Sequence, residues 1–152
     1  MTVVFKEELL RDCLEELNPL LEEHYKEVAL YQDKVKLNPD YDRYLMLEDA
    51  GNLHTVVARE DGKVVGYYIS LVVEHLHYAD TVYAHNDVVY LEPGLRHSRV
   101  ALDMINFAIE KLKEKGVSVV TIHMKTYLPF EGLASSIGFD KVEYLYSMYI
   151  GK

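Results

Sequence analysis

The spacing of the apolar residues changes once along the chain, and this change limits the folds that it can adopt. Over residues 6–30 the apolar side chains recur every three or four positions, which predicts helix. From residue 53 onward, apolar and polar residues alternate, which predicts strands. A chain of 152 residues with both periods predicts one domain, spanning residues 1–152, in which helices pack on a sheet.

The helical part is predicted to contain three helices. Asn18 and Pro19 interrupt the first apolar stripe, and Asn is favoured at a helix N-cap and Pro at the first helical position, so we expect two consecutive helices there. A further short helix is expected over 41–49, with Asp40 as its cap and Gly51 just past its end.

An antiparallel meander is predicted to follow. Strands are expected over 53–59, 63–74 and 80–91. The first two are joined through Asp61 and Gly62, a pair that tolerates the positive φ angles of a tight hairpin turn. Adjacent strands joined by so short a turn must run antiparallel.

The last third of the chain is predicted to add a parallel strand to this antiparallel meander. A helix over 96–115, a strand over 117–123, a short helix over 128–136 and a final strand over 141–150 are expected. The strand at 80–91 and the first two of these form one right-handed βαβ crossover. The predicted fold class is therefore α/β (α+β), a mixed and mostly antiparallel sheet flanked by helices. A doubly wound dinucleotide-binding fold is excluded, and the sequence has no G-x-G-x-x-G.

Charge narrows the classes of partner. There are 25 Asp and Glu against 16 Lys and Arg, a formal net charge of −9. Nucleic-acid binding is disfavoured, because neutralising phosphates requires a basic patch. An acidic surface suits a cationic substrate such as an amine, and it also serves plain solubility.

The cellular compartment is inferred from what the first residues and the cysteine content show. Charges at Lys6, Glu7 and Glu8 argue against a signal peptide, and no apolar run reaches the ~18 residues of a membrane span. Cys13 is the one cysteine, so no intramolecular disulfide can form. We expect a soluble, cytoplasmic protein.

The segment that carries chemistry lies where the strand over 80–91 passes through a short loop into a helix. The first amides of a helix have no partner within it and lie at the positive end of its dipole, which makes an anion site. Arg96 and Arg99 add positive charge there, and His97 and Ser98 add hydrogen-bond donors. The combination suits a pyrophosphate.

These residues resemble the GNAT superfamily of N-acetyltransferases. Val89-Tyr90-Leu91-Glu92-Pro93 is similar to the family's strand end, and Arg96-x-x-Arg99-x-Ala101 to its phosphate loop, R/Q-x-x-G-x-G/A. The resemblance extends over residues 50–150 and includes Ile137-Gly138-Phe139 before the final strand. Within the family the chain is most similar to GNAT-like proteins encoded by bacteriophages.

The resemblance implies an acetyl-CoA-dependent N-acetyltransferase. Acetyl-CoA would be the co-substrate, no metal would take part, and the acetyl group would pass directly to a primary amine of a small molecule or a protein. Backbone groups of Val89 and Leu91 would pair with the pantetheine arm. The pyrophosphate would be held by Arg96, His97, Ser98, Arg99, Val100 and Ala101.

Two catalytic roles are expected from the same resemblance. The amine must lose a proton before it attacks, and Asp87 is the candidate base, acting directly or through water. We expect its side chain on the same strand face as Val89 and Leu91; it is equally interpreted as an ordinary hydrogen-bonded strand residue. Tyr144 is the candidate acid for the departing thiolate, and Tyr127 and Tyr146 are alternatives for that role or for lining the amine cleft.

The chain departs from the family pattern at two positions. Arg99 replaces the first glycine of the phosphate loop, and Ala134 stands where the family often has a catalytic tyrosine. These departures keep open a catalytically weak or inactive GNAT-fold protein that binds acyl-CoA or a protein partner. An interaction protein that uses its acidic surface is a third alternative.

Two further alternatives remain open. His75 and His77 share a strand face and His85 lies on the next strand, which is an incomplete metal-ligand pattern, more typical of residues at the rim of a cleft. An unpaired sheet edge invites association, so neither a monomer nor a homodimer is favoured.

Overall fold

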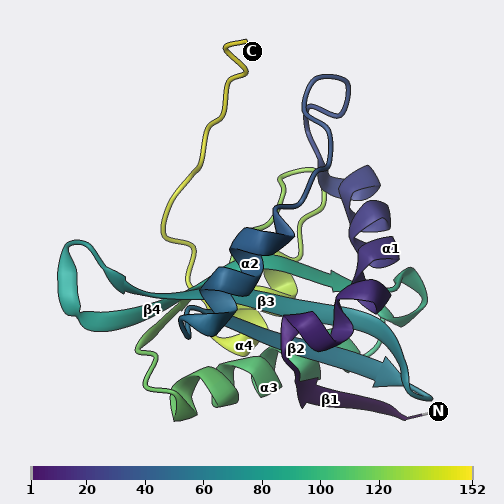
Figure 1. The fold of residues 1–152 in the computed structure, drawn as a ribbon, viewed down its shortest axis with the longest axis horizontal. Helices are drawn as coiled ribbons and strands as arrows, with labels where there is room; N and C mark the ends of the chain where they lie inside the picture. The colour runs from purple at the N-terminus through teal and green to yellow at the C-terminus, as the bar shows by residue number, and fades with distance from the viewer. Residues whose placement is uncertain (1, 152) are drawn as a thin grey trace.

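The computed structural model describes residues 2–151, which form one five-stranded sheet with helices on both faces (Figure 1). The strands lie in the order in which they occur along the chain, with β5 parallel to β4 and all other neighbours antiparallel. The strands are β1 (Val3–Glu7), β2 (Leu53–Glu60), β3 (Lys63–His75), β4 (Tyr78–Leu91) and β5 (Val119–Thr121). This arrangement confirms the predicted fold class.

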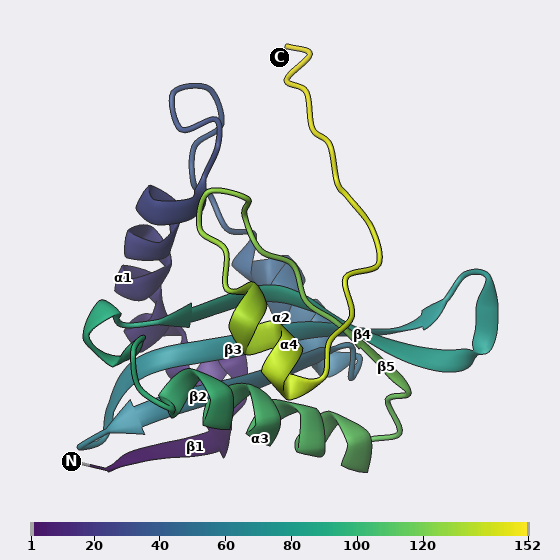
Figure 2. The same ribbon diagram turned by 180° about the vertical axis from the view of Figure 1, so that it is seen from behind.

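The helices divide between the two faces of the sheet (Figures 1 and 2). The helices are α1 (Leu10–Val28), α2 (Tyr41–Asp49), the single 3-10 turn η1 (Pro93–Leu95), α3 (Val100–Glu114) and α4 (Glu131–Ile137). On one face, α1 buries Leu10, Cys13 and Leu17 against apolar side chains of β2, β3 and β4. On the other, α3 buries residues such as Met104 and Leu112, with α4 packed beside it.

Local signals at turns and caps were predicted correctly. The Asp40 carboxylate accepts a hydrogen bond from the Arg43 amide at 3.0 Å, so it caps α2. Asp61 and Gly62 have φ angles of 50° and 83° in the β2–β3 turn, the region that this tight turn requires. Such signals depend on a few neighbouring residues, which is why the sequence reveals them.

The prediction of two helices before residue 30 is wrong. One helix, α1, runs through Pro19 without ending. Proline removes one intrahelical hydrogen bond and crowds the preceding turn. The burial of apolar residues of α1 against the sheet outweighs this cost, because most helix stability in proteins comes from packing. Strand β1, which pairs with β2, was not predicted.

The predicted final strand over 141–150 is also wrong. Residues 140–151, here called the C-terminal arm, form no strand and leave the body of the protein (Figure 1). Tyr31 in the loop after α1 contacts the arm through Ser147 and Tyr149. The alternating side chains favour an extended backbone, but a strand also needs a partner edge, and here the arm turns away from β5 (Figure 2).

Other boundaries shift by a few residues. The helix expected over 96–115 begins at Val100, because the preceding residues form η1 and a short loop. The strand expected over 117–123 is reduced to β5, which pairs with β4 over three residues. Among the described residues, no helix is long and apolar enough to cross a membrane.

Candidate active site

The sheet opens between β4 and β5. Their parallel pairing begins at Tyr83 and Val119 and ends at His85 and Thr121, while β4 continues to Leu91. Beyond His85, backbone groups of β4 that face β5 have no strand partner among the described residues. We call this unpaired edge of β4 the slot; its backbone groups can pair with an extended molecule, and the chain continues from it through η1 into α3.

A bulge in β4 lies at the start of the slot. Ile69 pairs with Val88 and Ser70 pairs with Asn86, so Asp87 is an extra residue between two regular pairs. The buried Asn86 amide donates to the carbonyl oxygens of Ile69 and Val88, each at 3.1 Å. One side chain thus bridges the two sides of the irregularity. A bulge changes the direction of the side chain that it carries.

The bulge overturns one expectation about Asp87. Its side chain points to the face that carries α1 and α2, where the Tyr44 hydroxyl donates a hydrogen bond to Oδ2. Val88 packs on this same face, whereas Val89 packs on the α3 face. Asp87 therefore does not share a face with Val89, because simple alternation fails at an inserted residue.

Tyr44 is a hydrogen-bond donor that keeps its proton. Burial, together with the hydrogen bond to Asp87, raises the pKa of the Tyr44 phenol well above its usual value. Asp87 also opens onto a cavity of about 300 Å³ that Asp40, Arg43 and Tyr44 line as well. The carboxylate is thus oriented by a fixed donor and is accessible from outside.

The loop that follows β4 leads into α3, whose N-cap residue is Arg99, and Ser98 lies just before this cap. The Ser98 hydroxyl donates to the Leu95 carbonyl at 2.6 Å and accepts from the Val100 amide at 3.2 Å. The Arg99 side chain is 81% exposed and lies 3.4 Å from the Asp103 carboxylate. This guanidinium is thus paired loosely with Asp103 at the surface, where it can also meet an anion at the beginning of α3.

Comparison with known proteins identifies the family. The sequence profile of the acetyltransferase (GNAT) family matches residues 10–130. The chain belongs to the GNAT acetyltransferase family. This family uses acetyl-CoA, and the match covers both the slot beside β4 and the start of α3. No curated protein matches the chain by sequence.

Solved structures share the GNAT fold at low sequence identity. An aminoglycoside acetyltransferase, meta-AAC0020, from an uncultured soil metagenomic sample in complex with sisomicin has a TM-score of 0.76 and 17% identity, with 99% of this chain and 96% of that chain covered. Glucosamine-6-phosphate N-acetyltransferase from Arabidopsis thaliana has a TM-score of 0.75 and 13% identity, with 99% and 100% covered. Ribosomal-protein-alanine N-acetyltransferase from Brucella melitensis biovar Abortus 2308 has a TM-score of 0.70 and 22% identity, with 99% and 100% covered.

Arg96, one of the residues expected to hold the pyrophosphate, contacts other parts of the protein in this structure. Its Nε donates to the Leu91 carbonyl at 2.7 Å, and its two terminal nitrogens donate to the Glu27 carboxylate at 2.7 and 2.8 Å. The guanidinium also lies 5.4 Å from the centre of the Tyr90 ring. Arg96 thus ties the end of β4 to α1, and its hydrogen bond lowers the pKa of Glu27.

The tyrosine candidates do not gather around Asp87. Tyr144 lies on the C-terminal arm with 74% of its surface exposed, and Tyr146 is more exposed still. The Tyr127 hydroxyl donates to the Val28 carbonyl at the end of α1. Ala134, at the position of the GNAT tyrosine, is buried in α4, and its carbonyl accepts from the amides of Gly138 and Phe139.

The histidine pattern forms an aromatic cluster on the β3–β4 hairpin. The rings of His75 and His77 lie 5.6 Å apart and contact Tyr78. His85 is hydrogen-bonded to Thr121 at 2.7 Å. Within residues 2–151, no three His, Cys, Asp or Glu side chains come together as a metal site.

Three residues of this site did not stand out in the sequence. They are Tyr44, Asn86 and His24, whose Nδ1 is hydrogen-bonded to the Tyr67 hydroxyl at 3.0 Å. Burial lowers the pKa of His24, so the imidazole is favoured in its neutral form. The position of His24 on the apolar side of a helix could have indicated its role. Tyr44 and Asn86 gave no such signal.

Proposed function

We propose that the chain is an acetyl-CoA-dependent N-acetyltransferase that moves an acetyl group to a primary amine. The observation that carries this proposal is the parting of β4 and β5 at a bulge that presents a carboxylate. The slot offers strand backbone to an extended chain, and its far end meets the first amides of α3.

Acetyl-CoA fits this slot by chemistry. Its pantetheine arm carries amides that pair with strand backbone, for which Val89 and Leu91 are the proposed partners. Its pyrophosphate suits the helix start. The proposed cradle is formed by Arg96, His97, Ser98, Arg99, Val100 and Ala101, with Arg99 as the exposed charge.

Asp87 is the proposed base. An alkylamine is mostly protonated at neutral pH, like a lysine side chain with its pKa of about 10.4, so it must lose a proton before its nitrogen can attack. Tyr44 holds the carboxylate toward the cavity from which the amine would arrive. The new N–C bond forms as the thioester C–S bond breaks, and the products are an acetamide and CoA.

Tyr144 remains the proposed proton donor to the CoA sulfur. In this structure it lies on the C-terminal arm, so this role requires the arm to fold toward β5. A phenol hydroxyl can act as a general acid that passes its proton to the departing thiolate. The bacteriophage subgroup, the cytoplasmic location and the homodimer also remain proposals.

Calorimetric titration with acetyl-CoA tests the binding half of the proposal. We expect binding by the wild type and a loss of about tenfold or more in Arg99→Ala, because a charged contact to phosphate is removed. Lys113→Ala, at the other end of α3, is the matched control and should bind normally. No binding by the wild type would exclude the enzyme and favour a protein-interaction role.

Turnover separates the enzyme from the inactive alternative, which the buried Ala134 favours. Asp87→Asn should lower kcat about 100-fold or more while the Kd for acetyl-CoA stays the same. Asp80→Asn, an exposed carboxylate at the other end of β4, is the control. Acetyl-CoA binding without any turnover by the wild type, across amine acceptors, would favour the binding protein.

A further inference from the structure

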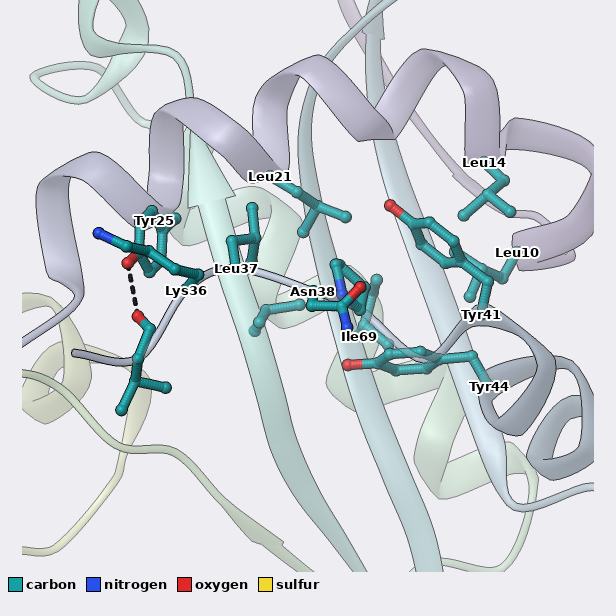
Figure 3. A pocket seen from close by; sticks show the side chains of 13 residues that line it. Leu10, Leu14, Leu21, Tyr25, Lys36, Leu37, Asn38, Tyr41, Tyr44 and Ile69 are labelled. Carbon is teal, nitrogen blue, oxygen red and sulfur yellow. Dashed lines mark hydrogen bonds between the residues drawn. The ribbon is translucent and has the colours of Figure 1, made fainter. Parts of the chain in front are cut away.

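A second cavity lies beside the candidate base, and its lining is mostly apolar. It measures about 340 Å³ and lies between α1, α2, the loop of residues 35–39 and the sheet (Figure 3). Leu10, Leu14 and Leu21 line it from α1, and the rings of Tyr41 and Tyr44 reach into it from α2. We call it the leucine–tyrosine cavity.

The two cavities meet at Tyr44. This ring lines the leucine–tyrosine cavity, and it also lines the smaller cavity onto which Asp87 opens. The floor of the larger cavity includes Val88, the residue next to Asp87 in the chain. The larger cavity is therefore adjacent to the Asp87 carboxylate, with the Tyr44 ring as a wall common to both cavities.

Charge is distributed unevenly between these cavities. The smaller one is lined by the carboxylates of Asp40 and Asp87 and by the guanidinium of Arg43, so that negative charge is in excess there. The leucine–tyrosine cavity has no acidic residue among its described lining, and the one charged residue there is Lys36. An ammonium group would be stabilised beside Asp87, but in the larger cavity it would lose water without gaining a counter-ion and would be repelled by Lys36.

We propose that the acceptor is a primary amine with a single positive charge and an apolar alkyl or aryl body, which lies in the leucine–tyrosine cavity with its nitrogen toward Asp87. This inference rests on the proposed N-acetyltransferase activity and narrows its substrate class. The group that reacts is held by charge, and the rest of the molecule is held by the hydrophobic effect. Aminoglycosides and other polyamines are disfavoured, because each further ammonium needs a carboxylate.

A homologous series of amines tests the proposal. With n-butylamine, n-pentylamine and n-hexylamine, kcat/KM should rise about fourfold for each added methylene, the factor expected for burial of one CH₂ group. We expect n-hexylamine to exceed 1,6-diaminohexane, glucosamine 6-phosphate and sisomicin by about tenfold or more. A flat series, or a diamine or aminoglycoside that is used equally well, would overturn the proposal.

A pair of loop variants tests the location. Leu37 lines the cavity, and 38% of its surface is exposed. Leu30 lies in the same connection between α1 and α2, is 56% exposed and is not part of the lining. Leu37→Asp should shift the preference from n-hexylamine toward 1,6-diaminohexane, because it places a counter-ion beside the second ammonium. Leu30→Asp should leave the preference unchanged, and equal effects of the two variants would contradict the assigned location.

Binding measurements distinguish failure of this inference from failure of the proposed function. If acetyl-CoA binds and n-hexylamine neither binds in NMR titrations nor is acetylated, the acceptor assignment is wrong while acetyl transfer to another amine stands. If n-hexylamine binds in a way that Leu37→Asp weakens, but no acetyl-CoA binds, the apolar amine site is real and the N-acetyltransferase activity is wrong.

Discussion

The Tyr44 hydroxyl donates a hydrogen bond to the Asp87 carboxylate, which joins α2 to the bulge of β4. These two residues are far apart in the sequence, and they meet because α2 packs over the face to which the bulge turns Asp87. In this arrangement Tyr44 would be a positioning residue, because it contacts the proposed base and also forms a wall of both cavities.

Removal of the Tyr44 hydroxyl should impair catalysis more than binding. We expect Tyr44→Phe to lower kcat about tenfold, because a hydrogen bond to a charged group is lost and the carboxylate is less well oriented. The Kd for acetyl-CoA should not change, since the slot lies beside β5. Tyr78→Phe, at an exposed tyrosine at the start of β4 outside the lining of both cavities, is the control. Equal effects of the two variants would mean that the contact with Asp87 has no special role.

The pair formed by Arg96 and Glu27 should stabilise the fold in a pH-dependent way. The hydrogen bond from Arg96 lowers the folded-state pKa of Glu27 below its ordinary value of 4.5. Its contribution is therefore complete above pH 4.5 and is lost as the pH falls through the lowered pKa. Because both side chains are partly exposed, we expect Glu27→Gln to lower Tm by only about 2 °C at neutral pH. A thermal shift that persists undiminished at pH 3 would contradict the ion pair as its cause.

A half-buried imidazole, His24, and a buried one, His54, should make the protein less stable in mild acid. Burial lowers the pKa of His24 and of His54 below the ordinary value of 6.5. The unfolded chain then binds more protons than the folded one, so the free energy of unfolding falls as the pH drops below 6.5. Denaturant titrations between pH 5 and pH 8 check this, and His24→Gln should flatten part of the slope. His97→Gln, on the exposed loop, should not.

The C-terminal arm should be dispensable for folding. Its large apolar side chains are exposed, so removing residues 141–152 sacrifices little burial, and we expect Tm to change by no more than about 1–2 °C. Limited proteolysis should cut the arm before it cuts the body of the protein. A loss of about 5 °C or more would show instead that the arm pairs with a sheet in solution, and sedimentation would then tell whether that sheet belongs to a second copy.

How much the sequence could predict depended on how local each signal was. Asp40, Asp61 and Gly62 act through their nearest neighbours, and their roles were predicted correctly. The order of strand end, loop and helix start after residue 80 was predicted for the same reason, since these elements are consecutive in the chain; that this loop holds a pyrophosphate stays a prediction. The features that depend on contacts between distant segments of the chain could not be predicted.

Pro19 and Asp87 illustrate what could not be predicted. The sequence shows that Pro19 costs stability within a helix, but not that packing of α1 on the sheet outweighs this cost. It shows Asp87 in a strand, but the side chain's direction depends on a bulge that exists only when β3 is placed opposite. Likewise, Tyr44 meets Asp87 only when α2 packs on the face of the sheet to which the bulge turns that carboxylate.

The bulge makes the Asp87 carboxylate independent of the regular pairing between β3 and β4. Asn86 and Val88 occupy consecutive partners on β3, so a chain without Asp87 could continue the ladder with every other pair in register. The carboxylate is thus an insertion into a sheet that is complete without it. During evolution, the proposed base could be gained or lost by insertion or deletion of this one residue, with no substitution in either core.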